Sequence, residues 1–115
     1  MLMSYPRSMR FWFYTAPTDM RKGYDGLAGL VNNGLQQDPR LGDVFVFISR
    51  SRVQIKLLYW DGDGYVMFSK RLERGRFDVP SSTGAALALR RDQLLMLLEG
   101  VRLVDTRKKV RFQLP

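Results

Sequence analysis

A single β-hairpin is the feature of this sequence that most restricts its fold. Apolar side chains alternate through residues 53–60, residues 65–70 resume as a partner strand, and Asp61-Gly62-Asp63-Gly64 between them favours a tight turn. Symmetry about this turn places these residues opposite each other: Trp60 and Tyr65, Tyr59 and Val66, Leu58 and Met67, Leu57 and Phe68, Lys56 and Ser69, Gln54 and Arg71. Since a slip of one residue would exchange the two faces, the register also assigns every side chain to a face.

The two faces of the predicted hairpin differ in chemistry. One face is apolar and is expected to belong to the core; it carries Ile55, Leu57, Tyr59, Val66 and Phe68. The other face surrounds Leu58 and Met67 with polar, basic and aromatic side chains, namely Gln54, Lys56, Trp60, Tyr65 and Arg71. We predict that this second face is a basic and aromatic surface.

Four further segments predict two strands and two helices. Residues 10–15 are aromatic and β-favouring, and residues 44–48 are continuously apolar, as expected of a central strand covered on both faces. Apolar residues at three- and four-residue steps predict a helix up to Leu35, with Thr18 or Asp19 as its N-cap. A second helix is predicted from about Arg91 to Glu99, ending at Gly100.

These elements predict an α+β fold in a single domain. The sheet is expected to be mostly antiparallel, with four or five strands, crossed by the first helix and capped by the second. A length of 115 residues suits one domain. We place an N-terminal lead at residues 1–9, the globular domain at 10–104, with a possible edge strand at 101–104, and a basic C-terminal tail at 105–115.

Glycine recurs every third residue along the first predicted helix, at Gly23, Gly26 and Gly29. Each glycine costs about 1 kcal/mol of helix stability relative to alanine. We therefore expect that these glycines allow close approach to another backbone.

The chain is strongly basic. It has 19 Lys and Arg residues against 11 Asp and Glu, a net charge of +8, and 14 of the 19 are arginine. Arginine forms bidentate hydrogen bonds with phosphates, so a polyanionic partner is the first hypothesis. The residues expected to form one nucleic-acid-binding patch at the free end of the hairpin are Arg50, Arg52, Lys56, Lys70, Arg71, Arg74 and Arg76. The alternative is a solvated rim that is partly neutralised by nearby carboxylates such as Glu73 and Asp78.

Two cations, Arg21 and Lys22, fall in the first turn of the predicted first helix, where the helix dipole disfavours them. An anionic ligand held there would extend the basic patch. The alternative is that Asp19 caps the helix and pairs with these cations locally.

The turn of the hairpin suggests two more sites, each with a simpler alternative. Trp60 and Tyr65 are candidates for stacking an unpaired base, although cross-strand aromatic pairs commonly serve sheet packing. Asp61 and Asp63 resemble a divalent-metal pair by composition, but each precedes a glycine in a turn that already explains it.

Missing residue types restrict the function. The sequence has no Cys and no His, which excludes disulfides, thiolate metal sites and Cys nucleophiles and removes the commonest general base. We expect no enzymatic activity and no cofactor. No apolar run is long enough for a membrane span, and residues 1–6 lack the features of a signal peptide, so we expect no membrane association and a cytoplasmic location.

Three ordered motifs resemble the accessory protein of insertion-sequence-66-type elements, the TnpB or second-open-reading-frame type. They are Thr18–Leu27 (TDMRKGYDGL), Ile55–Gly64 (IKLLYWDGDG) and Lys70–Phe77 (KRLERGRF). The resemblance covers roughly residues 10–104. Where the family has a basic stretch containing an acidic residue before Ile55, this chain has Ser51, Val53 and Gln54, so its basic run is shorter.

The resemblance implies a small bacterial, non-catalytic protein that supports transposition, with strand cutting and joining done by a separate transposase. Two hypotheses follow. In the first, the protein binds element DNA through the basic patch. In the second, it is an adaptor that docks on the transposase through the glycine-bearing helix and the aromatic surface, without direct contact with DNA.

Overall fold

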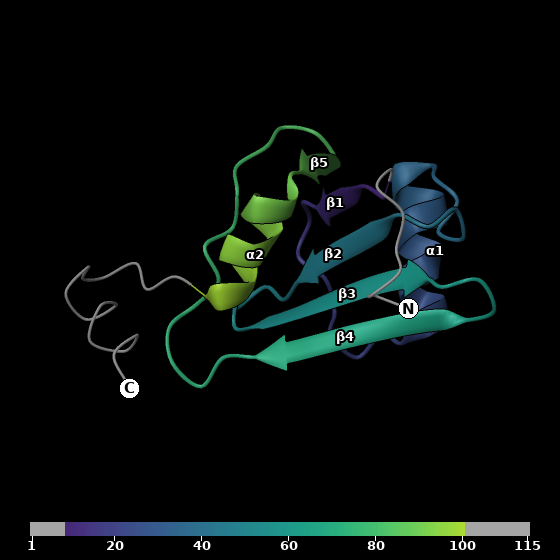
Figure 1. The fold of residues 1–115 in the computed structure, drawn as a ribbon. Helices are drawn as coiled ribbons and strands as arrows, with labels where there is room; N and C mark the ends of the chain where they lie inside the picture. Colours follow the sequence, from purple (N-terminus) through teal and green to yellow (C-terminus); the bar gives the residue numbers. More distant parts are fainter. Residues whose placement is uncertain (1–8, 101–115) are drawn as a thin grey trace.

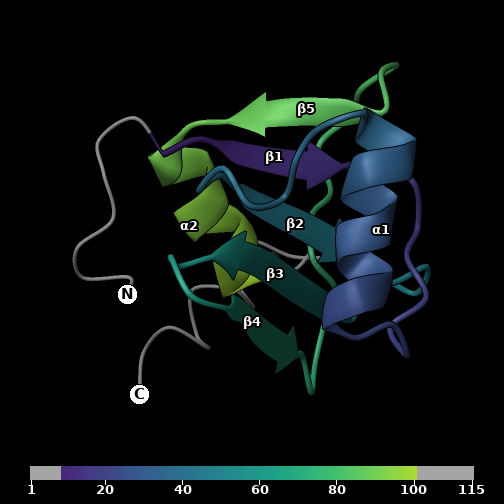
Figure 2. The same cartoon turned by 90° about the vertical axis from the view of Figure 1, so that its right-hand side faces the viewer.

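The computed structural model describes residues 9–100, which form a five-stranded mixed sheet with one helix on each face (Figures 1 and 2). The elements are β1 (Phe11–Tyr14), α1 (Tyr24–Leu35), β2 (Val44–Ile48), β3 (Gln54–Trp60), β4 (Tyr65–Arg71), β5 (Ala86–Leu89) and α2 (Arg91–Glu99). The strand order is β4-β3-β2-β1-β5, and only the β1–β2 pair is parallel. The predicted α+β fold with a mostly antiparallel sheet is therefore confirmed.

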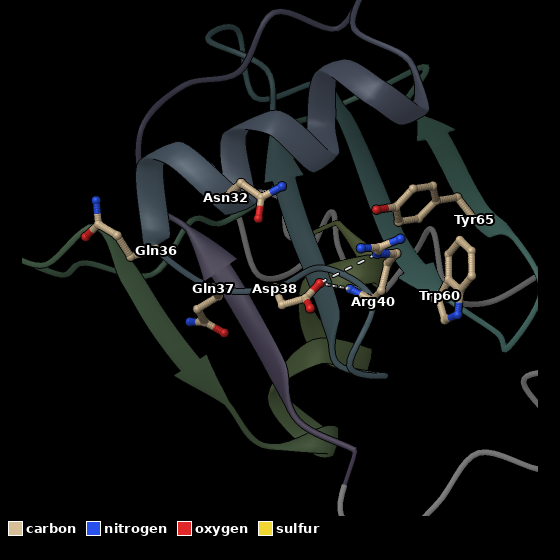
Figure 3. A pocket seen from close by; sticks show the side chains of 7 residues that line it. All are labelled: Asn32, Gln36, Gln37, Asp38, Arg40, Trp60 and Tyr65. Atoms are coloured by element: carbon tan, nitrogen blue, oxygen red, sulfur yellow. Dashed lines mark hydrogen bonds and ion pairs between the residues drawn. The ribbon is translucent and has the colours of Figure 1, made fainter.

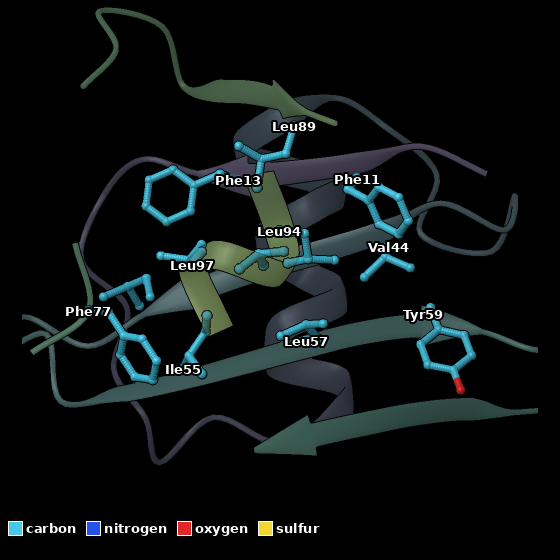
Figure 4. Close-up of a cluster of buried hydrophobic side chains, with 12 residues drawn as sticks. Phe11, Phe13, Val44, Ile55, Leu57, Tyr59, Phe77, Leu89, Leu94 and Leu97 are labelled. Carbon is cyan, nitrogen blue, oxygen red and sulfur yellow. The ribbon is translucent and has the colours of Figure 1, made fainter. Parts of the chain in front are cut away.

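The parallel pair requires a crossover connection, and α1 supplies it. Because α1 and α2 cover opposite faces, the sheet has two cores. Leu94 and Leu97 of α2 pack on one face against Phe13 and Ile55, as Figure 4 shows. On the other face, the buried residues of α1 pack against the sheet; this core contains Leu27, Ala28, Val31, Phe45, Phe47 and Leu58.

The hairpin register is confirmed pair by pair, from Gln54 opposite Arg71 to Trp60 opposite Tyr65. All five residues of β2 are buried, as predicted for a central strand, and α2 has the predicted bounds with Gly100 as its C-cap. Residues 1–8, the possible edge strand at 101–104 and the predicted tail at 105–115 lie outside the described residues. Within residues 9–100, no helix is both long enough and apolar enough to cross a membrane.

The predicted start of the first helix is wrong. The helix begins at Tyr24 with Gly23 as its N-cap, not at Thr18 or Asp19. The Asp19 carboxylate accepts the backbone N–H of Arg21 at 2.9 Å, and the Thr18 N–H donates to the carbonyl of Ile48 at 2.9 Å. These bonds hold residues 18–22 in a turn at the end of β2, because a short Asp side chain competes with helical bonding.

The explanation of the three spaced glycines by close backbone approach is also wrong. A Cβ atom added at Gly23 or Gly29 would meet no heavy atom within 4 Å, and the three nearest atoms to one added at Gly26 belong to the Lys22 side chain, the first at 3.1 Å. The glycine of α1 that is packed is Gly34, whose added Cβ would lie 3.2 Å from the Tyr14 ring.

We predict that Gly29→Ala stabilises the protein by about 1 kcal/mol, because alanine favours the helix and meets no neighbour here. Gly34→Ala is the matched control, since the same gain in helix propensity is opposed by contact with Tyr14. Urea denaturation measures both. A Gly29→Ala variant no more stable than Gly34→Ala would contradict the prediction.

Candidate nucleic-acid interface

Five exposed arginines gather at one end of the sheet, the end toward which the β4 arrow points in Figure 1. We call this set the basic rim: Arg50, Arg52, Arg71, Arg74 and Arg76. Two segments carry it, because β2 ends and β3 begins where β4 ends. The Phe77 N–H donates to the Arg52 carbonyl at 2.7 Å, and the Phe77 side chain is fully buried. This contact fixes the chain after β4 against the turn between β2 and β3.

Local carboxylates neutralise only part of the basic rim. Arg71 lies 3.7 Å from Glu73, and both side chains are well exposed, so this pair is weak. Arg74 also takes part in an interaction. In the part of the chain that the structure describes, no ion pair joins Arg50, Arg52 or Arg76 to a carboxylate. The rim is therefore a concentration of positive charge.

Arg52 adopts a left-handed backbone conformation, with φ of 63°. The turn imposes it: the Arg52 N–H donates to the Ser49 carbonyl at 2.9 Å, while the Arg52 carbonyl accepts the Phe77 N–H. For a residue other than glycine, this conformation costs about 1–2 kcal/mol.

We predict that Arg52→Gly raises the free energy of unfolding by up to about 1 kcal/mol, because glycine tolerates a positive φ. Arg52→Ala removes the same charge but keeps the strained backbone, so it should not stabilise. Urea denaturation compares the two variants, and equal stability would show that the turn stores no such strain.

Two lysines of the predicted patch do not belong to the exposed rim. Lys56 is only 8% exposed, and its ammonium donates to the carbonyls of Met20 at 2.7 Å and Lys22 at 3.0 Å. Lys70 is half-buried and donates to the Leu98 carbonyl at 2.7 Å, near the end of α2. The prediction that the second hairpin face is a surface was wrong at Lys56 and Leu58, which are both buried. Helix α1 packs on Leu58, and the turn at residues 18–22 covers Lys56.

Arg21 and Lys22 precede α1 instead of lying in its first turn. The Arg21 guanidinium donates hydrogen bonds from Nε and Nη2 to both oxygens of the Asp19 carboxylate, the shortest at 2.7 Å. These hydrogen bonds hold the pKa of Asp19 well below its usual range. The local pairing of Asp19 with Arg21, one part of the second alternative, is therefore observed, whereas Asp19 does not cap the helix, whose N-cap is Gly23 without a side-chain cap hydrogen bond.

Trp60 and Tyr65 form a T-shaped pair, with ring centroids 5.0 Å apart. They line a pocket of about 560 Å³ at the end of the hairpin opposite the basic rim (Figure 3). Amides from the end of α1 and the following loop line its other side, together with Arg40, whose guanidinium carbon lies 6.0 Å from the Trp60 ring centroid. The sequence pattern missed Arg40 because nothing local to it indicates a contact with residue 60.

The Asp61–Gly64 segment forms the predicted turn. The Asp61 N–H donates to the Gly64 carbonyl at 3.0 Å, and Gly62 has a φ of 104°. No group of three or more acidic side chains placed to hold a metal ion occurs in residues 9–100. The turn accounts for the composition of this segment.

Comparison with known proteins identifies the family. A family model described as IS66 Orf2 like protein matches residues 9–108. This chain is an IS66 Orf2-like protein. Two proteins of Sinorhizobium fredii are similar to it, and both are described only as uncharacterized. Protein y4hO is 43% identical over 95 residues, 83% of each chain, and protein y4jC is 34% identical over 103 residues, 90% of this chain and 88% of its own. No solved structure matches.

Membership of the IS66 Orf2-like family gives the protein a transposition-associated accessory role. The matched region contains the whole basic rim and both helices. The family resemblance expected from the three motifs is thus confirmed.

Proposed function

We propose that this IS66 Orf2-like protein is a non-catalytic accessory factor that binds DNA through the basic rim and assists a separate transposase. The observation that carries the proposal is the gathering of five exposed arginines at one end of the sheet, on a turn and a strand end that buried Phe77 ties together. A guanidinium donates two parallel hydrogen bonds to a phosphate and keeps its positive charge at any physiological pH, so such a rim suits a phosphate backbone.

A salt titration of DNA binding tests this proposal. Each phosphate neutralised on duplex DNA contributes about −0.9 to the slope of log affinity against log salt concentration. If each of the five arginines of the rim contacts one phosphate, the slope is about −4.5. Fluorescence anisotropy with a labelled duplex between 50 and 200 mM salt measures it. Absence of binding at low salt, or a slope near zero, would contradict the proposal.

Stacking of an unpaired base in the Trp60–Tyr65 pocket is a separate, finer part of the proposal. The Asn32 and Gln37 amides in this pocket offer donors and acceptors that suit base edges. We predict that Trp60→Ala lowers affinity for single-stranded oligonucleotides by roughly 5- to 150-fold, since base stacking is worth about 1–3 kcal/mol. Affinity for a fully paired duplex should not change. Equal loss on both substrates would count against a stacking role.

The alternative is an adaptor that docks on the transposase without touching DNA. Salt and nuclease distinguish the two: an adaptor complex should survive nuclease treatment and high salt in a pull-down with the cognate transposase. Loss of the complex under either condition would favour the DNA-binding proposal.

A further inference from the structure

The β4 strand forms an open edge of the sheet. In residues 9–100, no strand or helix lies beyond it, as Figures 1 and 2 show. It has seven residues, all in continuous register with β3 and without a proline, whereas the opposite edge strand, β5, has four. Proteins usually shorten, bend or cover an edge of this length, because its free N–H and C=O groups template the addition of another strand.

The register shows which backbone groups of β4 point away from β3. Bonds between Leu72 N–H and the Val53 carbonyl, 2.8 Å, and between Asp61 N–H and the Gly64 carbonyl, 3.0 Å, close the two ends of the hairpin. Bonded and non-bonded pairs alternate in an antiparallel ladder, so every second residue of β4 directs its N–H and C=O away from β3. By this alternation the outward-facing residues are Tyr65, Met67, Ser69 and Arg71.

An apolar groove of about 410 Å³ lies between α2 and the sheet and reaches the β4 edge at Phe68. Its floor includes Leu57 and Tyr59, its α2 wall includes Leu95 and Leu98, and Phe68 of β4 lines its edge. Phe68 is 43% exposed and Leu95 is 57% exposed. An extended segment paired with β4 would place every second side chain on the α2 face, and the side chains beside Phe68 would contact this groove.

Charge on the β4 edge selects the occupant. Exposed Arg71 ends the edge strand, and the register places it on the α1 face with Tyr65 and Met67, the face that the side chains between the groove-facing ones would share. An acidic residue in the added segment would therefore be favoured. A second copy of the chain is disfavoured, because each copy carries a net charge of +8.

We propose that the β4 edge and this groove bind an extended segment of a protein partner as an added strand, with apolar side chains at alternate positions and acidic side chains between them. The backbone of β4 supplies the hydrogen bonds, and Phe68 and Leu95 contact the apolar side chains. The β4 edge shares Tyr65 with the aromatic pocket and Arg71 with the basic rim, so the variants that test it are placed between these two sites, at Phe68 and Ser69.

The experiment uses the full chain and a labelled nine-residue synthetic peptide with valine and glutamate alternating. We expect saturable binding by fluorescence anisotropy, slower hydrogen exchange at the amides of Met67 and Ser69, and at least tenfold weaker binding for the same peptide with a central proline. A lysine-for-glutamate peptide should also bind at least tenfold more weakly.

Ser69 offers a matched pair of variants. Ser69→Ala loses the side-chain bond with Gln54, 3.2 Å, but keeps the outward N–H, and it should bind the peptide within twofold of the original protein. Ser69→Pro removes the outward N–H, a position where an edge strand tolerates proline, and should bind at least tenfold more weakly. Phe68→Ser, which alters an exposed residue, should weaken binding similarly.

Three results would overturn the proposal. The first is no peptide binding, or binding that Ser69→Pro and Phe68→Ser leave unchanged. The second is slow exchange of the edge amides before peptide is added, which would show that the chain itself covers the edge. The third is a dimer, seen by sedimentation, that Ser69→Pro converts to monomer, which would assign the edge to self-association.

Discussion

Replacing Arg71, Arg74 and Arg76 with alanine lowers the affinity for duplex DNA by roughly 10²- to 10³-fold at 0.1 M salt. The expected loss follows from counterion release: each phosphate contact removed costs nearly tenfold in affinity at this salt concentration. The slope of log affinity against log salt should fall by about 3 at the same time. Fluorescence anisotropy with one labelled duplex measures both quantities.

A charge-matched control separates the basic rim from net charge. The triple variant Arg10→Ala, Arg40→Ala and Arg90→Ala removes the same three charges, from arginines that pair with Asp43, Asp38 and Asp92 outside the rim. This control should lose less than tenfold in affinity and keep most of the salt slope. Equal losses in the two triple variants would show that DNA responds to overall charge only, and the rim would have no special role.

The hairpin could be predicted from the sequence because its signals are local. Alternation, turn residues and symmetry fix every pair from Gln54–Arg71 to Trp60–Tyr65, and the structure confirms each one. The bounds of α2 were equally accessible, since Gly100 ends its apolar pattern. By contrast, β5 is four residues long and pairs with β1, more than 70 positions earlier in the chain, so no local pattern marks it.

The α1 region shows where such prediction fails. The apolar spacing from Met20 to Leu35 fits a helix throughout, yet the side chain of Asp19 bonds the Arg21 N–H and the helix starts only at Tyr24. Residues 18–22 thus become a loop whose carbonyls lie over the sheet. The alternation in β3 places Lys56 on the α1 face of the sheet, but it contains no information on which segment will cover that residue.

That covering segment gives Lys56 a structural role, and its removal should have a large effect on stability. Lys56→Met should lower the free energy of unfolding by about 2–4 kcal/mol, because it leaves the part-buried Met20 and Lys22 carbonyls without their donor. A fully buried unsatisfied group costs about 1–3 kcal/mol, so each of these carbonyls is expected to cost about 1–2 kcal/mol. Urea denaturation monitored by Trp fluorescence measures the loss as a lower midpoint at constant m-value.

Lys22→Met is the control for Lys56→Met. It removes a charge from the same neighbourhood, but the hydrogen bonds described for residue 22 involve its backbone, so its cost should stay within about 0.5 kcal/mol. DNA binding then decides between the two roles of Lys56. If Lys56 contacted a phosphate, Lys56→Met would reduce the magnitude of the salt slope by about 0.9 and leave the urea midpoint unchanged. If Lys56 instead serves as a donor to the 18–22 turn, Lys56→Met would lower the urea midpoint and leave the salt slope of DNA binding by the folded protein unchanged. We expect the second result, because Lys56 as a residue is 8% exposed and its ammonium already donates to two carbonyls.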